Sequence, residues 1–164
     1  ILKENIKYLI VPFILIVMSL NLNFAHSAGN ADGGDSNKVS FYKQGKKLVL
    51  RAKKLEKKDK IEKAKKLYLK AYKKFEKAYA KDKKSADILN YLGYTLRKTG
   101  DLKKAEIFYL KGLEIDAKHI GINEYLGELY VITNRIELAK EKLDVLKNCN
   151  CEEYQELKEL IEKK

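Results

Sequence analysis

The strongest constraint on this chain of 164 residues is an internal repeat, because two stretches of its C-terminal half align at an offset of 34 residues without a gap. LRKTGDLKKA, at 96–105, aligns with YVITNRIELA, at 130–139. Residues of matching size pair at this offset: Tyr91/Tyr125, Leu92/Leu126, Gly93/Gly127, Leu96/Tyr130, Ala105/Ala139 and Tyr109/Leu143. A fixed period of this length is typical of solenoids, in which each unit buries its apolar face against the next.

Each copy has the pattern of a helix, a turn and a second helix. From Phe41 onward apolar residues recur at spacings of three and four, which favours amphipathic helices. Gly100 and Asn134 stand between the two helices of a copy, and these residue types tolerate left-handed backbone. The sequence therefore predicts repeats at 86–119 and 120–150, followed by an amphipathic cap helix at 151–163.

A third copy lies upstream. LEKKDKIEKA, at 55–64, keeps the same nine-residue step from a large residue to Ala. Its frame begins near Gly45, 41 residues before the next copy, so its second helix gains about two turns. Ala71, Phe75 and Ala78 continue the small-and-large pattern in a second register. We expect a repeat at 45–85 whose second helix covers 60–81 and partly projects beyond the stack.

These positions resemble the tetratricopeptide repeat (TPR) family. Its pattern sets Leu-Gly early in the first helix, and Ala followed by an aromatic residue in the second. The 86–119 copy matches at Leu92, Gly93, Gly100, Ala105 and Tyr109, and departs at Gly112 and Ala117, usually Ala and Pro. The resemblance implies an all-α fold, a right-handed α-α superhelix (TPR solenoid) of about three helix-turn-helix repeats plus a C-terminal capping helix.

The resemblance also implies a concave surface built by the first helix of each repeat. It would expose Lys46, Val49, Leu50 and Lys53, then Lys98 and Ile132 beside seven expected partner-binding residues. Those seven are Asn90, Tyr91, Tyr94, Arg97, Glu124, Tyr125 and Glu128. The tyrosines would anchor a protein segment of unknown identity. The alternative is that they only pack against a neighbouring helix. The Lys and Asn pattern that clamps a peptide carboxylate in chaperone-binding members is not matched.

The first 27 residues predict a signal peptide. Lys3 and Lys7 precede an apolar run at 8–20, and Ala25 and Ser27 suit cleavage before Ala28. An uncleaved membrane anchor is the alternative, although such a run is short for a bilayer, which needs roughly 20 residues. Residues 28–40, rich in Gly, Asn and Asp, suggest a flexible linker before a TPR domain at 41–164. We therefore expect an exported, periplasmic protein.

Two cysteines, Cys149 and Cys151, lie before the expected cap helix. A disulfide, two free thiols and a soft-metal site all remain open for this pair. The stretch LDVLKNCNCEEYQELKELI, together with LGELY at 126–130, resembles a group of exported alphaproteobacterial TPR proteins. That group has no assigned activity to carry over.

Positive charge concentrates at one end of the chain. Residues 43–84 hold 19 Lys and Arg against five acids, whereas residues 85–164 hold 13 against 15. The expected basic surface consists of Lys63, Lys66, Lys70, Lys73, Lys74 and Lys77. It is either a solvated helix face or a binder of an anionic membrane surface or polymer. The preference for Lys over Arg disfavours nucleic acid as a partner, because Arg binds phosphate groups in a more fixed geometry.

Few residues suit catalysis. The chain has two His, and only His119, expected to be exposed at a repeat junction, follows the signal segment. No Gly-rich phosphate loop or Ser-His-Asp arrangement is recognisable. We expect no catalytic residue, metal or cofactor, and predict a non-enzymatic protein-interaction adaptor of the cell envelope. A binder of anionic membrane through the helix at 60–81 is the alternative.

Overall fold

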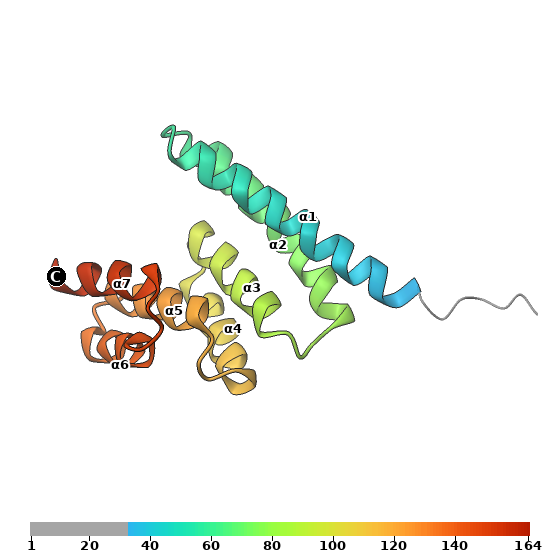
Figure 1. The fold of residues 1–164 in the computed structure, drawn as a ribbon. Helices are drawn as coiled ribbons and strands as arrows, with labels where there is room; N and C mark the ends of the chain where they lie inside the picture. The colour runs from blue at the N-terminus through green and yellow to red at the C-terminus, as the bar shows by residue number, and fades with distance from the viewer. Residues whose placement is uncertain (1–32) are drawn as a thin grey trace, which may run out of the picture. The chain divides into compact units, whose positions relative to one another are not determined.

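The computed structural model describes the backbone of residues 33–164 and the side chains from Ser40 onward. Residues 31–164 form one compact unit. The described residues contain seven α-helices and no strand: α1 (Gly33–Glu56), α2 (Ile61–Lys81), α3 (Ala86–Thr99), α4 (Leu102–Ile115), α5 (Ile120–Ile132), α6 (Ile136–Leu146) and α7 (Glu152–Glu162) (Figure 1). The predicted signal peptide lies outside the described residues.

The helices form an all-α solenoid, which confirms the predicted fold class. Consecutive helices pack as the hairpins α1–α2, α3–α4 and α5–α6, and α7 packs on α5 and α6. The first hairpin is the longest, and its turn lies beyond the end of α3 in Figure 1. None of the described helices is long and apolar enough to cross a membrane.

Contacts between a small residue and a ring set the distance between paired helices. A Cβ atom added at Gly93 would lie 2.5 Å from the ring of Tyr109, which is fully buried. In the first hairpin a Cβ added at Gly45 would lie 2.6 Å from the buried ring of Phe75. The first hairpin therefore repeats, at Gly45 and Phe75, the contact between a glycine and a ring that is seen in α3–α4. This contact helps to keep its two long helices close together.

The turn inside each repeat has the same backbone geometry. Asp59, Gly100 and Asn134 have φ values of 57°, 99° and 59°. After each of them, the next N–H donates to a carbonyl five residues earlier: Lys60 to Leu55, Asp101 to Leu96 and Arg135 to Tyr130. This pairing satisfies carbonyls that the helix end leaves free. Only one of the three turns uses Gly, since Asn and Asp also tolerate left-handed backbone.

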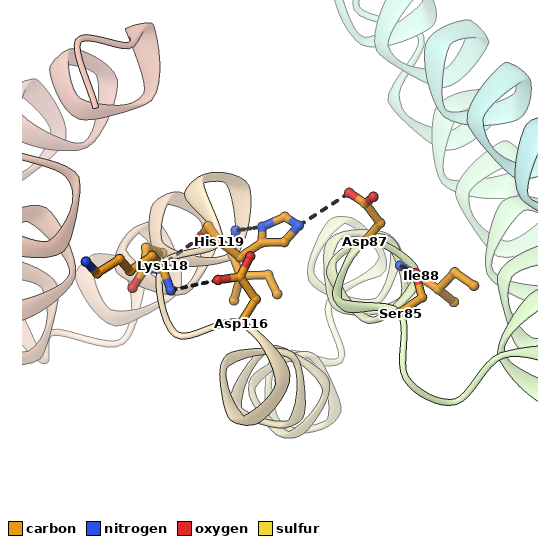
Figure 2. Close-up of polar contacts among 8 residues, drawn as sticks. Ser85, Asp87, Ile88, Asp116, Lys118 and His119 are labelled. Carbon is orange, nitrogen blue, oxygen red and sulfur yellow. Dashed lines mark hydrogen bonds and ion pairs between the residues drawn. The ribbon is translucent and has the colours of Figure 1, made fainter. Parts of the chain in front are cut away.

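The junctions between repeats also follow one scheme (Figure 2). Ser85 and His119 occupy the same place before α3 and α5, and each side chain accepts the N–H three residues later. His119 accepts with Nδ1, while its Nε2 lies 3.3 Å from Asp87 Oδ1 in the preceding repeat. His119 was expected to be exposed, and this is wrong: its side chain is 15% exposed because capping and the contact with Asp87 hold it against the junction.

The folded region also begins earlier than the sequence suggested. The flexible linker was expected over 28–40, but α1 starts at Gly33, inside that segment. Nucleating a helix is the costly step, so a helix fixed by packing from Phe41 onward extends into poor helix formers at small cost.

The contact between Gly45 and Phe75 gives a stability prediction. Gly45→Ala should destabilise the protein by about 1–3 kcal/mol, because the new methyl group overlaps the fully buried ring of Phe75. Urea unfolding measures this change, with the exposed Lys47→Ala on the same helix as the control. If Gly45→Ala were as stable as the control, α1 and α2 would not be in close contact at Gly45 and Phe75.

Candidate functional site

A hollow of about 90 Å³ lies on the face formed by α1, α3 and α5. Eight residues line it: Lys46, Val49, Leu50, Lys53, Asn90, Tyr91, Tyr94 and Tyr125. All come from first helices of the three repeats, which is where the resemblance placed the concave surface. We call this hollow the groove.

The tyrosines of the groove both line it and pack into the core. Tyr91 stacks on Phe75 with ring centroids 4.8 Å apart, and Tyr94 meets Tyr68 edge-on at 5.8 Å. Tyr125 leans on Tyr94 at 4.9 Å. Burial is the main cause that raises the pKa of Tyr94 to about 12, so this phenol stays neutral and can donate a hydrogen bond. The rings are thus fixed before any partner arrives.

Cations frame these rings. The Lys46 Nζ lies 5.9 Å from the centroid of Tyr91, and the Lys53 Nζ lies 5.1 Å from that of Tyr94. The guanidinium of Arg97 sits over Tyr94 at 5.5 Å and over Tyr125 at 5.3 Å. Arg97 also pairs with Glu128 at 2.5 Å, so its charge is already compensated. Lys46 and Lys53, for which the structure records only ring contacts, supply the positive charge of the groove.

Asn90 is the most unusual polar residue of the groove. It is only 7% exposed, and its Oδ1 is buried without a hydrogen-bond partner among the described residues. Its amide nitrogen lies against Gly121, where an added Cβ would come within 2.8 Å. A buried acceptor without a donor is uncommon and calls for a structural or functional reason.

An acidic cluster lies next to the groove. Carboxylate oxygens of Glu124, Glu128 and Glu156 lie within 4.8 Å of one another. Burial raises the pKa of Glu124 to about 9, helped by its hydrogen bond with Glu156 and the charge of Glu128. Glu124 is 3% exposed, so the expectation that it is an exposed contact residue is wrong. The same expectation is wrong for Val49, Asn90 and Tyr94, which are buried as well. Protonation removes the charge of Glu124, and so allows three carboxyl groups to share this space.

The sequence reasoning missed Glu156 as a member of this cluster. It is the fifth residue of α7, as Asn90 is of α3 and Glu124 of α5. Aligning the cap helix with the first helices of the repeats would have brought it into register with them. The cap helix therefore continues the inner row of first helices.

The remaining predicted residues lie away from the groove. Cys149 and Cys151 are joined by a disulfide in the turn before α7. The lysines of the expected basic surface lie on the outside of α2, where all are exposed except Lys74, which is half-buried: Lys63, Lys66, Lys70, Lys73, Lys74 and Lys77.

The hairpins, their shared turn geometry and the groove define an all-α solenoid of the tetratricopeptide type. In agreement, the family described as tetratricopeptide repeat matches residues 48–118. No curated protein sequence matches the chain significantly.

Solved structures show the same fold. The Yersinia enterocolitica type III secretion chaperone SycD, in complex with a peptide of the translocator YopD, is 19% identical; the match covers 72% of this chain and 86% of that one, with a TM-score of 0.51. The second TPR domain of human RPAP3, in complex with an HSP70 peptide, is 17% identical, with coverages of 80% and 100% and a TM-score of 0.53. The Arabidopsis OM64 TPR domain is 14% identical, with coverages of 75% and 98% and a TM-score of 0.51.

The raised pKa of Glu124 gives a pH-dependent prediction. The folded chain holds this proton from about pH 4.5, the usual pKa of the group, up to about pH 9, whereas the unfolded chain releases it. The contribution of Glu124 to stability therefore falls as pH rises through this window. Glu124→Gln should be more stable than wild type at pH 8 by on the order of 1 kcal/mol, and about equally stable near pH 4.5.

Urea unfolding at both pH values checks this prediction, with the exposed Glu114→Gln as the control. A Glu124→Gln effect of the same size at pH 4.5 and pH 8 would mean that Glu124 does not carry the proton.

Proposed function

We propose that this chain is a non-enzymatic scaffold that binds an extended segment of a partner protein in the groove. The observation that carries the proposal is the unpaired acceptor of Asn90. A buried acceptor left without a donor costs about 1–3 kcal/mol. Every residue of an extended peptide other than Pro has a backbone N–H, so a bound peptide can supply the missing donor.

The rest of the groove suits a peptide as well. Leu50 is 58% exposed beside the tyrosines, so an apolar side chain of a partner would cover surface that is now in water. The rings of Tyr91, Tyr94 and Tyr125 are already held by their neighbours. Binding would therefore order few side chains of the scaffold, which lowers its entropic cost.

The similar solved structures agree with this use of the fold. The SycD and RPAP3 domains were both solved with bound peptides. The partner of the present chain is not identified by this likeness, since the identities are below 20%.

We further propose that the scaffold works in the cell envelope after export. The predicted signal peptide supports this location. The disulfide between Cys149 and Cys151 supports it too, because disulfides persist mainly in oxidising compartments.

Site-specific photo-crosslinking in cells tests the proposed function. A benzophenone amino acid at Leu50 should give a discrete adduct with a protein of the envelope fraction. The same probe at Ile107, which is 51% exposed on α4 outside the groove, should give none. Adding Asn90→Leu to the Leu50 probe variant should lower the adduct yield about tenfold, since roughly 1.4 kcal/mol of binding corresponds to that factor.

Circular dichroism of the purified variants confirms that each remains helical. Adducts of equal yield from Leu50 and Ile107, or a Leu50 adduct that does not respond to Asn90→Leu, would contradict binding in the groove.

A further inference from the structure

A second surface lies on the first hairpin, on residues that do not line the groove. Five lysines of α2 recur there at spacings of three and four residues, so they form one row along the helix: Lys63, Lys66, Lys70, Lys74 and Lys77. At the end of α1 and in the turn after it, Arg51, Lys54 and Lys58 form a second row with the same spacing. We call these two rows and the residues between them the outer basic face.

Apolar side chains lie between the two rows. Leu55 and Leu67 form the floor of a shallow groove whose rim is Arg51, Lys54 and Lys58. Further along the hairpin, the Nζ atoms of Lys74 and Lys77 both lie 5.6 Å from the centroid of the Phe41 ring. The face thus combines cations on long, flexible side chains with partly exposed apolar residues between them. We call these apolar residues, Phe41, Leu55 and Leu67, the apolar seam.

The described carboxylates of the two helices have their recorded partners outside the two rows. Glu56 accepts a hydrogen bond from Tyr68 Oη at 2.8 Å and pairs with Lys98 of α3 at 2.7 Å. Burial and the neighbouring carboxylate of Glu76 raise the pKa of Tyr72, which packs against the core. Glu62, in the first turn of α2, pairs with Lys65. Among the described residues, no recorded ion pair joins a carboxylate to a cation of the two rows.

The outer basic face also points away from the rest of the solenoid. The hairpin meets α3 through Tyr42, Tyr68 and Phe75, which contact Tyr91 or Tyr94. Helical spacing places Arg51 and Lys54 on the other side of α1 from Tyr42 and Glu56. At the C-terminal end of the stack α7 covers the last repeat, whereas the hairpin α1–α2 forms the opposite end (Figure 1).

We propose that the outer basic face docks the protein on an anionic lipid bilayer. The charge extends along 63–77, a helix length of about 20 Å, instead of converging on one pocket. Lysine is a flexible point charge without the fixed fork of arginine, which suits mobile lipid headgroups better than one set of carboxylates. The half-buried apolar seam between the rows can reach the headgroup boundary without a deep insertion.

Other features of the chain favour a membrane over a second copy of the protein. Two outer basic faces pressed together would bring like charges into contact. In addition, the apolar run at 8–20 directs the chain to a membrane whether it acts as a signal peptide or as an anchor. Docking through the hairpin leaves the groove open, so this proposal does not depend on the proposed peptide binding.

Vesicle flotation of residues 28–164 tests the docking, since residues 31–164 form a compact unit and the apolar run is absent from this fragment. Vesicles of pure phosphatidylcholine are compared with vesicles containing phosphatidylglycerol. The test variant carries Lys54→Glu, Lys58→Glu, Lys66→Glu and Lys70→Glu. The matched control carries the same charge change at exposed lysines of other helices and turns: Lys103→Glu, Lys111→Glu, Lys118→Glu and Lys147→Glu.

Wild type and control should bind the phosphatidylglycerol vesicles, more strongly at low salt, and should not bind phosphatidylcholine alone. The test variant should bind at least about tenfold more weakly than the control, because electrostatic attraction to a bilayer falls off within a Debye length of the charges. Unchanged thermal unfolding by circular dichroism excludes misfolding as the cause.

Two results would overturn the proposal. Equal loss of binding in the test variant and the control would show that net charge, not this face, drives binding. Absence of vesicle binding at low salt, with retention of the wild type on a polyglutamate column, would show that the face recognises an acidic polypeptide instead.

Discussion

The close approach of paired helices, set by a glycine against a buried ring, is the constraint on which the other features depend. At Gly93 and Tyr109, and again at Gly45 and Phe75, no side chain of any size fits between helix and ring. These contacts hold the helices of the first two hairpins together. The contact at Phe75 also helps to hold the groove in place, since Phe75 is the ring on which Tyr91 of the groove stacks.

The two candidate surfaces follow from this packing and use different residues of the first hairpin. On the side facing α3, the rings of Tyr91 and Tyr94 are fixed and Asn90 is buried with an unpaired oxygen. On the outer basic face none of the other described helices covers α1 and α2, and lysine side chains surround apolar residues. The groove offers fixed rings and one unpaired acceptor, whereas the outer basic face offers dispersed charge.

Much of the fold could be predicted from the sequence because the repeat is encoded locally. The offset of Gly93 and Gly127 and the residues Gly100 and Asn134 indicate helix pairs and turns without knowledge of distant contacts. Other features arise only in three dimensions. The burial of Glu124 and the addition of Glu156 to its cluster depend on how α7 packs on α5. The helical start at Gly33 depends on packing further along α1.

A double-mutant cycle between Gly93 and Tyr109 tests the central packing claim most directly. If the glycine is required because of the ring, Gly93→Ala should destabilise the wild type by about 1–3 kcal/mol. In a Tyr109→Leu background the same change should cost at least about 1 kcal/mol less, because the methyl group then finds space and Ala is a better helix former than Gly. Additive effects of the two substitutions would contradict the account, since the glycine would then be serving something other than the ring.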